Sequence, residues 1–445
     1  MNVDPSRLVQ APIGTRSPHP PSSRPPNKQQ CPPQPTTHII PTVPVIQRPN
    51  TRSPSPVLTN LYTIAHLILF SQLGTLARLG VQASTSYSGA PSTLPVLWTN
   101  AGGCFVMGFL VEDKPGLWRE WQSGAATAAT AGVVSSGTAD AVGPDKEIHT
   151  EPGGDLHGPT TVMRTAQQRS AALRRKIPLY VGLTTGFCGS FTSFSAFARD
   201  IFLALANGLP SPVYHEPPTL SSPDSRAPAM SQQLAGRNGG YSVAAVLAVL
   251  ILTVSLSLSA LSFGKHIALL LSDRRWTASV SERFVTRILD PLTVFLALGC
   301  WIGAVMMAAF PPYDEWRGQA LFAVILAPLG CLIRYYLAVY LNAGVAGFPM
   351  GTFVANVSGT LMLGVMYDLQ HASIGGVIGC QMLQGVQDGF CGCLTTVSTW
   401  AAELKSLRRR QAYVYGLCSV GVSWALLIIV MGSLKWSGGF RQKSC

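Results

Sequence analysis

Two similar blocks, rich in glycine and then in hydroxyl residues, carry the side chains that could do chemistry. They read GFCGSFTSFSAF at residues 186–197 and GFCGCLTTVSTW at residues 389–400. Gly, Ser and Thr at this density permit a helix to break inside a membrane, provided that the freed backbone groups find partners in the protein interior. Two breaks brought together would present carbonyl oxygens that suit a monovalent cation. Close packing of two crossing helices is the alternative explanation.

Two asparagines lie in the middle of apolar stretches. Asn100 and Asn356 are each followed by glycine eight residues later. An amide in hydrocarbon is costly unless it meets a partner or a water-filled path. Its two N–H donors suit an anion, and an interhelical hydrogen bond is the alternative.

A row of hydroxyls is expected near the C-terminus. Tyr415, Ser419 and Ser423 recur every four residues, which places them on one helical face about 12 Å long. Such a row can replace the waters around an ion one by one.

The corresponding row in the earlier stretch over 241–263 looks incomplete. When Gly264 is matched with Gly432, Ser255 aligns with Ser423, whereas Leu247 and Ile251 replace the other two hydroxyls. The sequence therefore predicts one complete polar track and one broken track.

Aromatic residues show the opposite asymmetry. Phe194 and Phe197 lie in the first block, where the second block has Val397 and Trp400. The positive edge of a phenyl ring can face a small anion without adding a fixed charge. A Phe pair at this spacing is also ordinary core packing, and only the neighbouring residues favour the anion interpretation.

The composition indicates a membrane protein. Of 445 residues, 47% are hydrophobic and 12% charged, about half the charged fraction of a typical soluble protein. This argues against a soluble enzyme. Several of the ten cysteines lie in apolar runs, where Cys behaves as a small hydrophobe, so we expect no disulfide and no CxxC metal site.

Nine apolar stretches could cross a bilayer, each about 20 residues long. They lie near 57–83, 93–111, 177–205, 241–263, 289–310, 319–342, 349–368, 373–404 and 412–434. Residues 1–56 and the inserts over 112–176 and 206–240 are rich in Pro, Gly, Ser or Thr and are expected to be disordered. The fold class predicted is an all-α polytopic membrane protein.

Charge placement predicts the orientation. With a cytosolic N-terminus, 23 of the 32 basic residues fall in cytosolic segments, as the positive-inside rule requires. The C-terminal tail over 435–445 is then external. The net charge of +12 therefore needs no nucleic acid partner.

The chain contains an internal repeat. LGTLARLG at 73–80 resembles LGCLIRYY at 329–336, which aligns Arg78 with Arg334, and WTNAGGCFVMG at 98–108 resembles VANVSGTLMLG at 354–364. We therefore expect a first copy over 57–263 and a second over 319–434, each with four helices and a broken third helix. The linker over 264–318 contributes one helix, 289–310, which would invert the second copy, as in many transporters. We favour a structural or entrance role for the two arginines.

With these blocks, the chain resembles the fluoride exporter family, which comprises small bacterial Fluc or CrcB-like channels and fused fungal-type FEX forms. The resemblance implies a passive, fluoride-selective channel with a central structural Na⁺ and no organic cofactor. It would place backbone carbonyls around Na⁺ at Gly189, Thr192, Gly392 and Thr395. It would place the fluoride pathway at Asn100, Phe194, Phe197, Asn356, Thr396, Tyr415, Ser419 and Ser423.

We further expect that only one of two pseudo-equivalent pathways conducts, with the phenylalanines of the first copy joined to Asn356, Ser419 and Ser423. A monomer in the plasma membrane suffices, with fluoride and lipid as its partners and no obligate protein partner. A fused dual-topology exporter of small cations or drugs is the alternative, but it would want a carboxylate deep in a span. An intramembrane hydrolase would need a partner for His66, and none is evident in the sequence.

Overall fold

The computed structural model describes residues 55–112, 170–209, 239–273, 281–372 and 376–445, apart from positions 88–91, 93, 171, 312, 314–315, 442 and 444. The expected disorder over 1–56, 112–176 and 206–240 falls almost wholly outside these residues and stays a prediction.

The first copy consists of two continuous helices, one interrupted segment and a long final helix. Their bounds are α1 Pro56–Thr85, α2 Pro95–Val111, α5 Pro178–Val181, the π-helical turn η1 Gly182–Cys188, α6 Gly189–Phe191, α7 Phe194–Leu205 and α8 Gly239–Asp273.

The linker and the second copy repeat this order after one additional helix. The linker contains α9 Glu282–Phe284, η3 Val285–Leu289 and α10 Asp290–Ala309. The second copy contains η4 Arg317–Leu321, α11 Phe322–Leu341, α12 Met350–His371, α13 Gly376–Gly385, η5 Val386–Cys391, α14 Gly392–Leu394, α15 Ser398–Ser406 and α16 Arg409–Ser437.

The described residues are helical or connecting and contain no strand, so the all-α prediction is confirmed. Within this described part of the chain, six helices are long and apolar enough to cross a membrane. They are Pro56–Thr85, Gly239–Ser272, Glu282–Ala309, Phe322–Leu341, Met350–His371 and Arg409–Ser437. The other three expected spans correspond to the shorter α2 and the two interrupted segments, so the nine-span layout stays a prediction.

Both third segments break where the sequence predicts. The backbone leaves the helix at Thr192, with φ −98° and ψ 150°, and at Thr395, with φ −96° and ψ 152°. These are extended conformations. After the first break, the Ser193 side chain accepts a hydrogen bond from the N–H of Ala196 at 3.3 Å and caps α7, as serine commonly does.

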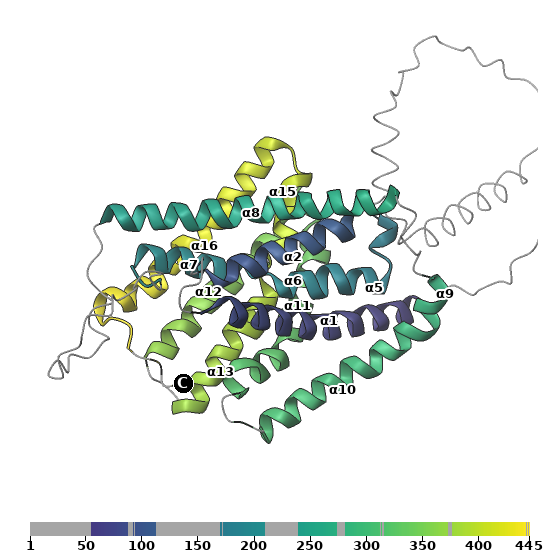
Figure 1. The fold of residues 1–445 in the computed structure, drawn as a ribbon, viewed down its shortest axis with the longest axis horizontal. Coiled ribbons are helices and arrows are strands. Elements are labelled where there is room, and N and C mark those ends of the chain that lie inside the picture. Colours follow the sequence, from purple (N-terminus) through teal and green to yellow (C-terminus); the bar gives the residue numbers. More distant parts are fainter. Residues whose placement is uncertain are drawn as a thin grey trace, which may run out of the picture. The chain divides into compact units, whose positions relative to one another are not determined.

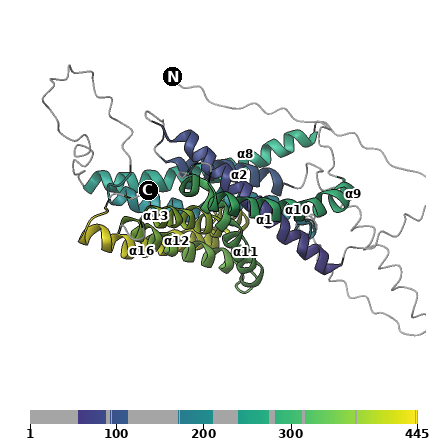
Figure 2. The same ribbon diagram turned by 90° about the horizontal axis from the view of Figure 1, so that it is seen from below.

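Close helix contacts hold the elements together. In Figure 1, α8 runs along α2, and a Cβ atom on Gly108 or Gly264 would collide with backbone atoms of the facing helix. Glycine at these positions therefore lets the two backbones approach. Figure 2 shows α12 beside α16, the corresponding pair in the second copy.

The linker helix α10 packs against α1 and supplies the partner of His66. The Nε2 atom of this buried histidine lies 3.5 Å from Asp290 Oδ1 and 3.4 Å from Thr293 Oγ1. The histidine thus joins α1 to the linker helix.

The expectation of no disulfide is wrong, because Cys380 and Cys445 are bonded, with 5.7 Å between their Cα atoms. Cys380 lies in α13 and Cys445 follows α16. Cys380 lies near the start of the apolar stretch 373–404, so an apolar surrounding did not exclude a disulfide, and the bond ties the C-terminal segment to α13.

Candidate functional site

The two helix breaks lie against each other, and each threonine at a break caps a helix of the other copy. Thr192 Oγ1 accepts hydrogen bonds from the N–H groups of Val397 and Ser398, both at 3.2 Å. Thr395 Oγ1 accepts one from the N–H of Ser195 at 3.0 Å. The first turns of α7 and α15 are therefore stabilised by reciprocal contacts between the copies.

The serines at these helix starts also cross between the copies. Ser398 donates to the carbonyl of Cys188 at 3.1 Å, and Ser195 donates to the carbonyl of Cys391 at 3.4 Å. Thr396 Oγ1 lies 3.2 Å from Thr192 Oγ1. Much of the hydroxyl content of the two blocks therefore joins the breaks.

Both asparagines clamp the break of their own copy. Oδ1 of Asn100 accepts the N–H of Ser193 at 2.9 Å, and its Nδ2 donates to the Ser193 carbonyl at 3.4 Å. Oδ1 of Asn356 accepts the N–H of Thr396 at 2.8 Å, and its Nδ2 donates to the Thr396 carbonyl at 3.2 Å. One of the two N–H groups of each amide is thereby engaged.

These contacts alter the carbonyls four residues earlier. In an α-helix, the carbonyls of Gly189 and Gly392 would accept the N–H groups of Ser193 and Thr396. Since those N–H groups donate to the asparagines, both glycine carbonyls lose their usual helical partner.

The carbonyls of Thr192 and Thr395, at the breaks themselves, also lack a backbone hydrogen-bond partner among the described residues. Among the described hydrogen bonds outside regular helices, none ends on the carbonyl oxygen of Thr192 or Thr395. These four carbonyl oxygens, two from each break, are ligands of the kind that a hard cation prefers. The described residues contain no cluster of three His, Cys, Asp or Glu side chains that could bind a metal in another way.

The two arginines also lie at the breaks and cross between the copies. Arg334 is buried and donates to the carbonyl of Thr185 at 2.7 Å and to that of Cys393 at 2.8 Å. Arg78 is buried and donates to the carbonyl of Asp388, the residue equivalent to Thr185. Each guanidinium thus binds the π-helical turn of the other copy.

Glycine is required beside each guanidinium. A Cβ atom on Gly189 would collide with the side chain of Arg334, and one on Gly392 with that of Arg78. The glycine three residues before each break threonine thereby leaves room for the arginine of the other copy.

The predicted polar track on α16 is fully buried, with Tyr415, Ser419 and Ser423 all 0% exposed. Tyr415 donates its O–H to Glu403 Oε2 at 2.7 Å, and Ser419 donates to the Tyr415 carbonyl at 2.7 Å. The hydroxyl of Ser423 has no partner among the described residues. Of the three groups, Ser423 is therefore the one most available to an ion.

The expected register of the other track is wrong by two residues. Leu247 and Ile251 on α8 are exposed, at 51% and 61%, whereas Val249, Thr253 and Ser257 are buried. The first copy therefore carries two buried hydroxyls and lacks the tyrosine.

The reason is that the two glycines used for the alignment are not equivalent. Gly264 faces Phe105 of α2, whereas Gly432 faces Trp436 of its own helix. The better match pairs Gly108, which faces Leu261, with Gly364, which faces Leu427.

Aromatic rings meet beside the breaks. Phe194 and Phe197 are buried, and their rings stand at 84° with centroids 5.7 Å apart. Trp400 of the second copy stands at 69° to Phe194 with centroids 5.4 Å apart. Trp400 stands where the pattern of the first block predicts a phenylalanine, and its indole adds an N–H donor.

Helix packing defines two candidate pathways. Helix α7 packs against α12 and α16, and we call the region between these three helices the α16 pathway. Helix α15 packs against α2 and α8, and we call this the α8 pathway. The first therefore joins the helix of the two phenylalanines to those of Asn356 and Ser423.

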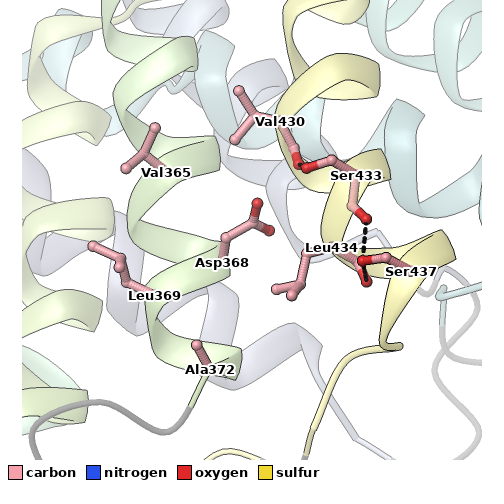
Figure 3. Close-up of a pocket in the computed structure, with 8 residues that line it drawn as sticks. All are labelled: Val365, Asp368, Leu369, Ala372, Val430, Ser433, Leu434 and Ser437. Atoms are coloured by element: carbon pink, nitrogen blue, oxygen red, sulfur yellow. Dashed lines mark hydrogen bonds between the residues drawn. The ribbon is translucent and has the colours of Figure 1, made fainter.

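A groove of about 500 Å³ lies between α12 and α16, away from the breaks. In Figure 3 the Asp368 carboxylate points from α12 towards α16, beside Leu434 and Ser433. A carboxylate here would repel an anion, so the groove does not fit an anion-collecting mouth.

Comparison with known proteins extends this picture. The family model described as CrcB-like protein, Camphor Resistance (CrcB), matches residues 65–214 and 321–433, more than half of the chain. The chain belongs to the CrcB-like family. The two matched regions each contain one helix break and one of the two buried arginines.

Several curated proteins are similar to the chain. Fluoride export protein 1 of Neurospora crassa is 47% identical over 403 residues, covering 88% of this chain and 70% of the relative. Fluoride export protein 1 of Candida albicans is 28% identical, covering 82% and 78%. Fluoride-specific ion channel FluC of Pseudomonas aeruginosa is 33% identical, covering 27% of this chain and 98% of the relative. No solved structure matches the chain.

Proposed function

We propose that the chain is a passive, fluoride-selective channel that releases fluoride from the cytosol and so gives fluoride resistance. The observation that carries this proposal is the α16 pathway, which joins the helix of Phe194 and Phe197 to those of Asn356 and Ser423, a serine whose buried hydroxyl has no partner among the described residues. The names of the relatives support the same ion.

Fluoride is small, hard and strongly hydrated, so a channel must replace its waters without holding it too long. Neutral amide and hydroxyl donors and the positive edges of phenyl rings meet that requirement. Flow outward needs no energy source beyond the inside-negative potential and the ionisation of entering hydrogen fluoride. The proposal assigns transport to the chain and no chemical conversion.

We place conduction in the α16 pathway alone. Its aromatic pair, Phe194 and Phe197, belongs to the first block, where the second block has Val397 and Trp400. Tyr415 on α16 corresponds to Val249 on α8 when the buried residues of the two helices are aligned. Thr396 lies at the break, where its hydroxyl contacts Thr192.

A structural Na⁺ is part of the proposal. The carbonyls of Gly189, Thr192, Gly392 and Thr395 would hold it, since the first and third have lost their helical partners to asparagines. The ion would be coordinated by carbonyl oxygens from the breaks of both copies and so join the two copies.

We also propose that the protein is a monomer of the plasma membrane with its N-terminus in the cytosol. The disulfide between Cys380 and Cys445 supports an external C-terminus, because disulfides persist in oxidising compartments. Reciprocal contacts between the two copies within one chain support a monomer.

The test is fluoride efflux from liposomes that contain the purified protein, followed with a fluoride electrode. We expect fluoride release well above that from protein-free liposomes and no comparable chloride release under the same gradient. Fluoride release at the protein-free rate, or equal chloride release, would contradict the proposal.

A further inference from the structure

Three buried polar groups without described partners occur on α15 and α16. They are the indole Nε1 of Trp400, the hydroxyl of Ser423 and the indole Nε1 of Trp424. An indole N–H can only donate, so it cannot be satisfied by accepting a bond from elsewhere. A buried donor left without an acceptor is costly and calls for an explanation.

Trp400 lies on α15, and its ring contacts α7 and α16, the two helices that face each other in the α16 pathway. Its side chain is 2% exposed, and its ring stands at 69° to that of Phe194 in an edge-to-face contact. A Cβ atom on Gly416 would lie 3.8 Å from the six-membered ring of Trp400. The indole therefore lies between α7 of the first copy and α16 of the second.

Trp424 follows Ser423 directly on α16. It packs against the cluster that contains Phe194 and Trp400, and also against the cluster that contains Phe202 of α7. The second indole thus lies where α16 faces α7, further along the same pathway.

The α8 pathway offers no second indole pair. Trp400 corresponds to Phe197, and the burial register of α8 places Leu258 where α16 has Trp424. Both indole donors therefore occur in the second copy, and neither has a tryptophan counterpart in the first.

We propose that Trp400 and Trp424 donate their indole N–H groups to fluoride as it passes along the α16 pathway, together with the hydroxyl of Ser423. This inference rests on the proposed function. Hydrogen bonds to an ionised acceptor are stronger than those between neutral groups. A neutral indole supplies such a bond without the fixed charge that would hold the ion in place.

The experiment compares Trp400→Phe and Trp424→Phe with the parent protein in the liposome assay. Each change keeps an aromatic ring and removes the N–H. Trp301→Phe is the matched control, because the N–H of Trp301, on the linker helix α10, donates to the carbonyl of Ile325 on α11 at 3.0 Å. We expect fluoride efflux to fall about tenfold or more in the two test variants, as one lost bond to an ion predicts, and to be unchanged in the control.

A second measurement separates ion binding from packing. The ultraviolet resonance Raman bands that report indole N–H hydrogen bonding are expected to shift when fluoride, but not chloride, is added to the parent. The shift is expected to weaken in Trp400→Phe and in Trp424→Phe, and to persist in Trp301→Phe.

The outcomes distinguish failure of the indole inference from failure of the proposed function. Parental efflux in both test variants, or reduced efflux without any fluoride-dependent Raman shift in the parent, would overturn this inference while the channel function stands. Absence of fluoride efflux from the parent protein would overturn the proposed function itself.

Discussion

Asn356 and Thr396 form a closed pair of hydrogen bonds, in which the amide accepts the backbone N–H at 2.8 Å and donates to the carbonyl of the same residue at 3.2 Å. This pair holds the break of the second copy in its extended conformation. It also withdraws the N–H group that the carbonyl of Gly392 would otherwise accept.

Aspartate substitutions at the two asparagines separate clamping from conduction. Asn356→Asp keeps an acceptor for the Thr396 N–H but removes both amide donors and adds a negative charge. We expect fluoride efflux to be abolished in Asn356→Asp and largely retained in Asn100→Asp, whose residue faces the non-conducting pathway. Fluoride-electrode traces of the two variants, in protein that elutes as a single folded species, check this. Equal loss in both would contradict conduction by one pathway.

Alanine at Gly189 or Gly392 is expected to destabilise the protein. The new methyl group would collide with Arg334 or Arg78, and overpacking of this kind costs about 1–3 kcal/mol. Thermal unfolding in detergent, followed by size-exclusion fluorescence, measures the loss. Gly299→Ala is the control, since a Cβ there meets no atom within 4 Å. An unfolding temperature equal to that of the parent would refute the close arginine contact.

Phenylalanine at Tyr415 is expected to lower stability more than conduction. Its hydroxyl proton is engaged by Glu403, whose other carboxylate oxygen accepts a bond from Thr352 at 2.7 Å. Loss of one partner of a buried polar group costs about 1–3 kcal/mol. We expect a lower unfolding temperature and fluoride efflux close to that of the parent. Abolished efflux at unchanged stability would instead place the Tyr415 hydroxyl on fluoride.

The disulfide gives a test of orientation. A membrane-impermeant maleimide added to intact cells is expected to label Cys380 and Cys445 only after an impermeant reductant has been applied. Cys380→Ser is expected to make Cys445 reactive without reduction. Labelling of neither cysteine until the membrane is permeabilised would place the C-terminus in the cytosol.

Much of the fold follows from sequence because its determinants are local. Paired Gly and hydroxyl blocks predict a break in each third segment, and the structure places these breaks at Thr192 and Thr395, whose hydroxyls cap the helix of the other copy. The equivalence of Arg78 and Arg334 was also visible in the sequence. Their reach into the other copy was not, because it depends on how the copies pack.

Other features depend on tertiary contacts that the sequence does not encode locally. The register of α8 is set by the approach of Gly108 to Leu261, whereas a sequence match of terminal glycines gives a different register. Likewise, the importance of Trp400 comes from an indole N–H that is buried without a described partner, and residue type alone does not reveal burial.

The most direct test of the central claim compares two equivalent serines in the liposome fluoride assay. Ser423 lies on α16 and Ser257 occupies the matching buried position on α8. We predict that Ser423→Ala lowers fluoride efflux about tenfold, as loss of one hydrogen bond to an ion would, and that Ser257→Ala conducts like the parent. Equal losses in the two variants, or a loss confined to Ser257→Ala, would contradict fluoride conduction through the α16 pathway.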